Sequence, residues 1–296
     1  MNHVRQQPGP RHPSGRAAGR LIRRVRFVLF GLVLFVVFVV PYEWMVASSF
    51  KGQYVIFQDV SPLSIGAFIP RNITFDNFVW LQQNRAVLRA LLNSAIVAVA
   101  QVAGTVIISA PAAYAMSRMS FRGRNVLFLV ILLTFMVPTE ALIVPMYSVV
   151  SGYGLSNNLA AVFLPWVASP FALFLLRQAF DSIPRELDEA AVIDGASHWQ
   201  VFRHVILPNA TTALATVVLV TFLFSWNAFL WPLVILQSPD LTVVQVAIAQ
   251  SVVPGELPNW GTTFAGATLA SMPILVLFVF LQRYFIRGFV LSGLKG

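Results

Sequence analysis

The chain has 296 residues, of which 57% are hydrophobic and 10% are charged, whereas a soluble domain carries about 25% charged residues. This deficit of charge indicates a polytopic membrane protein. The sequence has no cysteine, which excludes a disulfide framework, a thiolate metal site and thiol catalysis. The formal net charge is +9. Because the basic residues flank apolar segments, this charge indicates orientation in a membrane and not binding to nucleic acid.

The first residues of the chain are rich in arginine, proline and glycine. We expect residues 1–24 to form a basic, disordered cytoplasmic tail. The apolar segment that follows reaches about Met45 and is longer than the ~7–15 residue core of a signal peptide. We therefore expect it to be retained as the first transmembrane helix, within a region 25–89 that also contains an outer loop.

Six apolar segments approach the length of about 20 residues that a spanning helix needs. Charged residues or clusters of Pro, Gly and Asn bound each of them. They cover residues 25–48, 90–115, 125–149, 158–179, 209–235 and 263–285. We predict an all-α fold with about six transmembrane helices. Its main membrane domain occupies residues 90–288, and residues 289–296 form a C-terminal segment.

The distribution of Lys and Arg predicts how the helices are oriented. With the N-terminus inside, sixteen of the 20 Lys and Arg residues fall in inner segments. The outer connections 150–157 and 236–262 contain neither residue type. Because cytoplasmic loops carry the excess of Lys and Arg, we expect both termini and the polar segment 181–208 to be cytoplasmic.

The polar segment 181–208 carries signals for two short helices joined by a turn. Pro184 suits the start of a helix, and the acidic residues that follow it favour the positive end of the helix dipole. Gly195 is suited to a left-handed helix cap. Ser197 and Gln200 have the spacing of a capping box. We predict a helix, a turn and a second helix at the inner membrane surface.

The same segment resembles the signature loop of the permeases of ABC importers, in which Glu-Ala-Ala is followed at fixed spacing by Gly, an aliphatic residue and Leu-Pro. Here the pattern is filled by Glu189, Ala190, Ala191, Gly195, Val205, Leu207 and Pro208, with Val205 in place of the usual Ile. The flanking sequences 182–187, 193–197, 225–232, 282–288 and 293–296 are similar to those of the maltose-type carbohydrate permeases. The resemblance covers residues 70–296 and implies a type I ABC importer fold.

In that family the short helix docks in a groove of a separate ATPase subunit, and ATP-driven closure of the ATPase dimer reorients the membrane helices. The resemblance implies that ATPase coupling rests on Glu189, Ala190, Ala191, Asp194, Gly195, Arg203, Leu207 and Pro208. It also implies a chain that catalyses no reaction and binds no cofactor, since ATP and Mg lie on the ATPases. The implied partners are a homologous second permease, two ATPase subunits, an extracytoplasmic solute-binding protein and the lipid of a prokaryotic inner or plasma membrane.

Four polar or amphipathic residues inside the apolar segments are candidates for the solute pathway: Asn93, Glu140, Trp226 and Asn227. A carboxylate within a membrane is a functional candidate, although Glu140 alternatively faces water or caps a broken helix. Trp226 and Asn227 suit the aromatic and hydrogen-bonding chemistry that binds sugars. The alternative for these two is hydrogen bonding between helices. The resemblance further implies that the outer connection 237–261 reaches the solute-binding protein.

Two other classes of protein fit the composition less well. The chain lacks a Gly-x-x-x-x-Gly-Lys-[Ser/Thr] phosphate loop, so an external ATPase or an ion gradient must drive it. A secondary transporter needs charged coupling residues in the membrane, and only Glu140 qualifies. An intramembrane enzyme needs a catalytic set within the spans, and we find none. The resemblance implies a carbohydrate or related solute, that is a sugar, a polyol or a glycerol phosphate, and the alternative is an ABC permease for a non-sugar solute.

Overall fold

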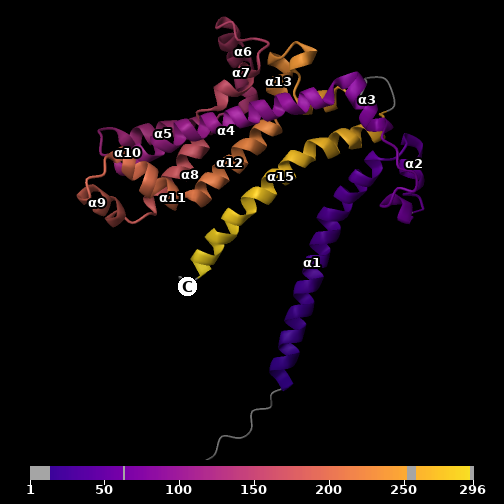
Figure 1. Cartoon of the computed structure of the whole chain (residues 1–296), viewed down its shortest axis with the longest axis horizontal. Coiled ribbons are helices and arrows are strands. Elements are labelled where there is room, and N and C mark those ends of the chain that lie inside the picture. The colour runs from indigo at the N-terminus through magenta and orange to yellow at the C-terminus, as the bar shows by residue number, and fades with distance from the viewer. Residues whose placement is uncertain (1–13, 63, 252–257, 294–296) are drawn as a thin grey trace, which may run out of the picture.

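The computed structural model describes residues 14–62, 64–251 and 258–293 (Figure 1). All regular elements in these ranges are helical. Three helices are long and apolar enough to cross a membrane without a break: α1 (Ser14–Ser49), α4 (Val87–Arg118) and α15 (Trp260–Gly293). Three more spans are possible if each of three bent pairs of helices is counted as one. The prediction of an all-α chain with about six spans is confirmed.

The bent pairs differ in how sharply they turn. The first joins α5 (Arg124–Thr134) through η2 (Thr139–Leu142) to α6 (Ile143–Gly152) with a bend of 91°. The second joins α7 (Leu159–Phe163) and η3 (Leu164–Trp166) to α8 (Pro170–Asp181) with a bend of 46°. The third joins α10 (His198–Val201), the π-helical turn η4 (Phe202–Ile206) and α11 (Leu207–Asn209) to α12 (Thr211–Trp226) with a bend of 79°.

Three apolar segments that we expected to be continuous are broken: 158–179 at the bend between η3 and α8, and two others. The segment 125–149 breaks after Phe135, and Pro138 stands directly before η2. The segment 209–235 breaks after Trp226 and resumes as α13 (Leu230–Ile235), with Pro232 in its first turn. Proline has no backbone N–H to continue a helix but fits a first turn, where that donor is not needed. Both prolines thus favour a restarted helix over an unbroken one.

Helix α4 is the axis of the bundle and packs along α8 and α12, while α12 also packs against α15 (Figure 1). Its buried face carries mainly alanine, serine and other small or polar residues. A Cβ atom added at Gly104 would lie 2.7 Å from the Cγ1 of Val167. Small residues at helix interfaces let backbones approach closely in membranes. The same residues therefore explain how α4 serves as the central element.

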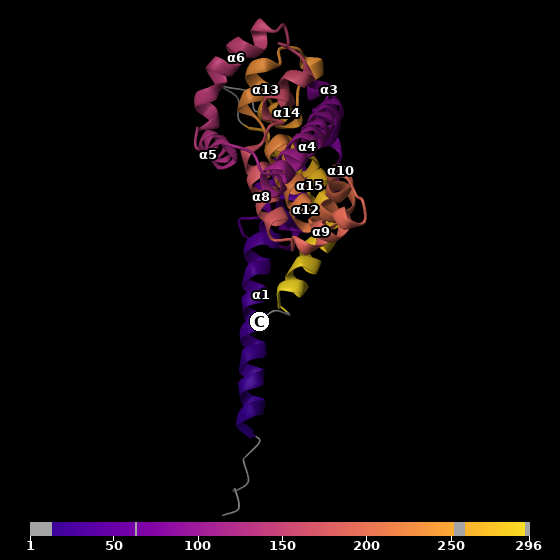
Figure 2. The ribbon, with the colours of Figure 1, turned by 90° about the vertical axis from the view of Figure 1, so that its left-hand side faces the viewer.

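Helix α1 meets the rest of the molecule at its C-terminal end, where it packs against α15, and then diverges from the bundle (Figures 1 and 2). The Tyr42 hydroxyl and the Ser271 Oγ lie 2.8 Å apart at this junction. The apolar side chains between Phe27 and Val39 are exposed, as expected of a surface that faces lipid.

The first and last helices, α1 and α15, are longer than we expected. Helix α1 begins at Ser14 and so includes residues that we assigned to a disordered tail. Arg, Ala and Leu favour helix, and residues 14–24 contain no proline. Helix α15 continues to Gly293, so residues 289–293 are helical. Residues 1–13 and 294–296 lie outside the described residues.

The outer loop after α1 folds against the bundle through α2 (Gln53–Gln58), η1 (Ile65–Ala67) and α3 (Asp76–Arg85). The buried Lys51 Nζ donates to Asp59 Oδ2 at 3.2 Å and to the carbonyls of Gly66 and Ala67. The Asn77 amide donates to the carbonyls of Ser49 and Lys51 at 2.9 and 2.8 Å. Loop and helix ends are thereby fixed to one another at the end of the molecule opposite α9 (Glu186–Ile193) (Figure 1).

Candidate functional site

The predicted helix–turn–helix is present at one end of the molecule, where α9 and α10 project from the bundle (Figure 1). Gly195 has a φ of +83°. Its N–H donates to Val192 O at 3.0 Å, and the N–H of Ala196 donates to Ala191 O at 2.9 Å. This pair of bonds is a Schellman motif, which satisfies the last carbonyls of a helix. No atom lies within 4 Å of a Cβ at Gly195, so backbone conformation and not space favours glycine here.

The second helix begins at the predicted capping box. The Ser197 N–H donates to Gln200 Oε1 at 2.7 Å, and the Gln200 N–H donates to Ser197 Oγ at 3.4 Å. Pro184 lies just outside α9, which starts at Glu186. Local signals therefore determine both ends of the turn between the helices.

The eight residues expected to couple to an ATPase divide into two groups. Exposed side chains belong to Glu189, Ala190, Asp194, Arg203 and Pro208, and Gly195 is exposed as well, whereas Ala191 and Leu207 are partly buried against the core. Large apolar side chains are also exposed on this loop, and the three most exposed are Val192, Ile193 and Trp199, with exposed fractions of 53%, 85% and 60%. Our sequence analysis missed these three. The available signal was the presence of these apolar residues within the otherwise polar segment 181–208.

A hollow of about 410 Å³ separates α9 and α10 from the end of α4. An ion pair crosses it, with Arg118 Nε 2.6 Å from Asp188 Oδ2, and the two side chains are only 6% and 17% exposed. Arg118 Nη2 also donates to Ile183 O at 2.7 Å. In the sequence, Arg118 served only as a marker of membrane orientation. Its partner lies 70 positions away, so local pattern had no means of pairing them.

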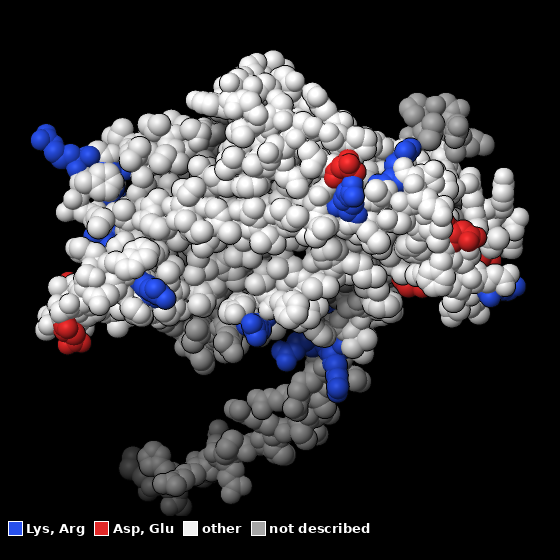
Figure 3. Space-filling view, turned by 45° about the horizontal axis from the view of Figure 1, so that its top comes forward, with Lys and Arg blue, Asp and Glu red and all other residues white. Residues whose placement is uncertain are grey.

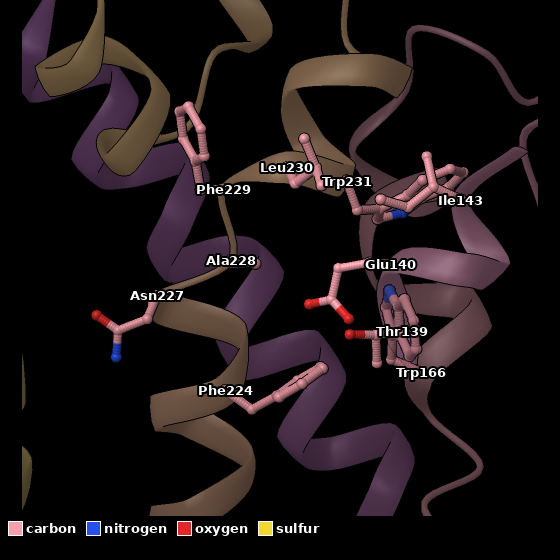
Figure 4. Close-up of a pocket in the computed structure, with 10 residues that line it drawn as sticks. All are labelled: Thr139, Glu140, Ile143, Trp166, Phe224, Asn227, Ala228, Phe229, Leu230 and Trp231. Carbon is pink, nitrogen blue, oxygen red and sulfur yellow. The ribbon is translucent and has the colours of Figure 1, made fainter. Parts of the chain in front are cut away.

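A second hollow, of about 280 Å³, opens where two of the spans break. Its lining combines polar and aromatic side chains from η2, η3 and the end of α12, namely Thr139, Glu140, Trp166, Phe224 and Asn227 among others (Figure 4). The Trp166 and Phe224 rings meet edge to face with centroids 5.6 Å apart. Figure 4 shows the Glu140 carboxylate turned into the space and the Asn227 amide turned away from it. None of the ten lining residues is Lys or Arg.

The structure places the four pathway candidates in three different settings. Glu140 and Asn227 line the same hollow. Trp226 is 1% exposed, and its Nε1 donates to Ala270 O at 2.9 Å, which is the interhelical hydrogen bond considered as the alternative. The Asn93 amide donates to the carbonyls of Asp240 and Thr242 at 2.9 and 3.0 Å, so it ties α4 to the outer connection.

The outer connection 237–261 is structured over the part that is described. It contains η5 (Pro239–Leu241) and α14 (Val244–Ala249), which packs on α4 and α15. The Asn157 Oδ1 accepts from the N–H groups of Gln237 and Ser238 at 2.9 and 2.8 Å. Residues 252–257 of this connection, with Pro254 and Glu256, lie outside the described residues.

Charge is sparse over the visible surface. Most of the face in Figure 3 is uncharged, and the few Asp and Glu residues on it are scattered. Such a distribution suits a molecule whose middle contacts lipid or other membrane helices. Among the described residues, no three His, Asp or Glu side chains are grouped as a metal site requires.

Comparison with known proteins agrees with the helical architecture and the projecting loop. Residues 104–290 match the model of the family described as binding-protein-dependent transport system inner membrane component. The chain belongs to this family. It is therefore a multi-helix inner-membrane transport component, and the predicted family is confirmed. Members of this family are transport permeases, which argues against the intramembrane enzyme that we considered as an alternative.

Individual relatives cover most of the chain. The arabinooligosaccharides transport system permease protein of Halalkalibacterium halodurans is 33% identical over 269 residues, which are 90% of this chain and 94% of the relative. The sn-glycerol-3-phosphate transport system permease protein of Pectobacterium atrosepticum is 37% identical over 68% of this chain and 72% of its own length. The crystal structure of a bacterial ABC transporter involved in the import of alginate matches with a TM-score of 0.74, 23% identity and coverage of 94% and 100%. This last likeness supports the fold.

Proposed function

We propose that the chain is one of two permease subunits of an ATP-driven importer for a neutral carbohydrate. Its partners are a homologous permease, two ATPase subunits that hold ATP and Mg, and an extracytoplasmic solute-binding protein. The observation that carries the proposal is the loop 186–208. Local hydrogen bonds shape this loop, and its surface exposes apolar side chains that a partner protein could cover. Membership of a transport family with solute-binding partners supports the same assembly.

The loop has the features of a docking element for an ATPase. It exposes a carboxylate at Glu189 beside the apolar side chains of Val192, Ile193 and Trp199. Exposed apolar and aromatic groups are typical anchors of protein interfaces. A charge at the same place selects a partner of opposite sign. We therefore assign α9 to a groove on the ATPase, with Glu189 opposite a basic residue and with both termini of this chain on the same, cytoplasmic side.

The hollow at the breaks of the spans is our candidate for the solute pathway. Trp166 and Phe224 offer aromatic faces, and Thr139 and Glu140 offer hydrogen-bonding groups. This combination suits sugar rings, whose C–H faces stack on aromatic side chains and whose hydroxyls donate to carboxylates. The relative named for arabinooligosaccharides supports a carbohydrate. A glycerol phosphate is the second candidate, favoured by another relative, but a phosphate group normally needs Lys or Arg, and the hollow has neither.

The outer connection is our candidate for contact with the solute-binding protein. A solved alginate ABC transporter was crystallised in complex with a substrate-bound periplasmic protein, and it matches this chain with a TM-score of 0.59. Here the connection is held in a defined shape by α14, Asn93 and Asn157. An ordered outer surface is better suited to docking than a flexible linker.

Purification and reconstitution test the proposal directly. The tagged chain should co-purify with a second permease and an ABC ATPase encoded by the same organism. The purified complex in vesicles should import a labelled neutral oligosaccharide only when ATP is inside and the solute-binding protein is outside. A chain that purifies alone and exchanges solute in response to an ion gradient would instead be a secondary transporter. ATP-dependent import of glycerol phosphate, with no import of sugar, would overturn the carbohydrate assignment alone.

A further inference from the structure

The end of α4 holds the coupling loop through two consecutive residues. The Ser117 Oγ donates to Asp181 Oδ1 at 2.6 Å, at the last residue of α8. The next residue, Arg118, reaches past the turn between α8 and α9, donating to Ile183 O and pairing with Asp188. The last two residues of α4 therefore contact the end of α8, the turn that follows it and α9 itself.

Few other contacts join α9 to the membrane helices. Its backbone lies chiefly against α10 and the π-helical turn η4, which belong to the same loop. The side of α9 that faces α4 borders the 410 Å³ hollow, so packing there is incomplete. The Arg118–Asp188 pair crosses this hollow and is largely shielded from water. Shielding of this kind makes an ion pair less sensitive to screening than a surface pair.

Helix α4 connects this contact to the outer side. It is continuous from Val87 to Arg118 and packs along α8 and α12. At its other end, Asn93 and the Ser94 Oγ hold the outer connection by hydrogen bonds to Asp240, Thr242 and Val244. A displacement of α9 that is transmitted to α4 therefore reaches both the walls of the bundle and the outer loop.

From this geometry we infer that Arg118 is the positioning residue that makes α9 and α4 move together, so that closure of the ATPases moves the membrane helices. The inference rests on the proposed coupling role of the loop. It assigns to the Arg118–Asp188 pair the transmission of motion, not the binding of the ATPase, because the two side chains are paired with each other and are only 6% and 17% exposed. Loss of the pair should leave a complex that hydrolyses ATP but moves little solute.

The test measures solute transported per ATP hydrolysed in the reconstituted complex. Arg118→Gln and Asp188→Asn should each lower this ratio by about tenfold or more, a typical coupling between sites, with ATP hydrolysis retained. Arg177→Gln is the matched control. Arg177 lies at the same membrane side, is similarly buried and pairs with Asp181, but it makes no ion pair with α9. Its ratio should match that of the unaltered complex.

A covalent tie separates transmission from simple folding. Because the chain has no cysteine, the pair Arg118→Cys/Asp188→Cys can be joined with a bifunctional thiol reagent about as long as the lost arginine side chain, in a complex with cysteine-free partners. Transport per ATP should be low before linking, should recover on linking and should fall again on release with a reducing agent. The exposed pair Arg89→Cys/Asp240→Cys, at the outer side, should show no such cycle.

Three results would overturn the inference. One is an unchanged ratio in Arg118→Gln. Another is loss of assembly in the cysteine pair that linking does not repair, which would make the ion pair a folding element. A third is a low ratio that linking leaves low. An unaltered complex that neither binds an ATPase nor transports solute would instead refute the proposed function, so the two failures are distinguishable.

Discussion

The two ends of the molecule are held together in different ways. At the inner end, α9 and α10 are shaped by bonds between residues only a few positions apart, such as the Schellman bonds at Gly195 and the capping box at Ser197. At the outer end, the connection after α13 is held by side chains distant in sequence, such as Asn93, Asn157 and Ser94. The inner loop is shaped by its own local bonds and joined to α4 by buried contacts of Tyr114, Ser117 and Arg118, whereas the outer loop is held mainly by side chains of other elements.

This difference indicates which of the two loops can move as a rigid unit. A loop with local bonds keeps its shape when displaced, and a loop with many distant bonds does not. The inner end therefore suits the reception of a mechanical signal, and the outer end suits the presentation of a fixed surface. Substitutions at the two ends should therefore affect transport in different ways.

Gly195→Val should have the largest effect. A β-branched residue at a φ of +83° destabilises the turn by about 1–2 kcal/mol or more, so the turn should open and transport should fall by about tenfold or more. Membrane insertion should be unchanged, as measured by yield in the membrane fraction. Gly195→Asn is the matched control, since asparagine tolerates the left-handed region, and it should retain most of the transport. Equal loss in both variants would mean that the left-handed turn is not what the loop requires.

Glu189→Arg should weaken retention of the ATPase by about tenfold, because a reversed charge at an interface repels its partner. Titration of ATPase onto the purified permease pair measures the affinity, and a higher salt concentration should reduce the difference. Glu186→Arg is the control on the same exposed helix, outside the signature pattern. If Glu186→Arg weakens binding as much as Glu189→Arg does, general charge and not a specific pair governs docking.

Two tryptophans should respond in opposite ways. Trp166→Ala removes an aromatic face from the hollow and should lower solute transport several-fold while the complex stays assembled. Trp226→Ala removes a buried, hydrogen-bonded side chain and should destabilise the subunit by about 3–5 kcal/mol. Thermal stability and transport per assembled complex distinguish the two effects. Normal transport in Trp166→Ala would exclude this hollow from the pathway.

Asn157→Ala should have the smallest effect in this series. It removes three hydrogen bonds between outer segments, each with a net value of about 0.5–1.5 kcal/mol. Stimulation of ATP hydrolysis by the solute-binding protein should fall, while basal hydrolysis stays the same. Arg89→Ala is the control, because its pair with Asp240 is exposed and such pairs contribute about 0–1 kcal/mol. Unchanged stimulation in Asn157→Ala would show that a fixed outer loop is not needed.

The sequence predicted structure that depends on neighbouring residues, and it did not predict structure that depends on contacts between distant ones. Gly195, Ser197 and Gln200 carry their structural instructions within a few residues, so the inner loop was predicted in detail. The 91° bend between α5 and α6 was not, although Pro138 was visible, because tertiary packing decides whether a proline bends a span or ends it. The hollow around Glu140 depends on that bend.

Contacts between residues far apart in the sequence could not be predicted either, because they depend on tertiary packing. Arg118 and Asp188 are both ordinary charged residues in the sequence, and only the fold shows that they meet away from water. Trp226 had two interpretations in the sequence, as part of the solute pathway or as a hydrogen-bond donor between helices. Its bond to Ala270 O depends on how α12 packs against α15. The lengths of the apolar segments predicted that these helices exist, but they do not determine which faces meet.

Site-specific photocrosslinking at Ile193 tests the central claim most directly. This side chain is 85% exposed on α9, and a single cysteine placed there can carry a photoreactive label, because the chain has no other cysteine. We expect a crosslink to an ATPase subunit, at a yield that changes when ATP binds. The same label at Tyr153, which is 79% exposed in an outer connection, should give no crosslink to the ATPase. A crosslink to the ATPase from Tyr153 and none from Ile193, in a complex that still transports, would contradict the account.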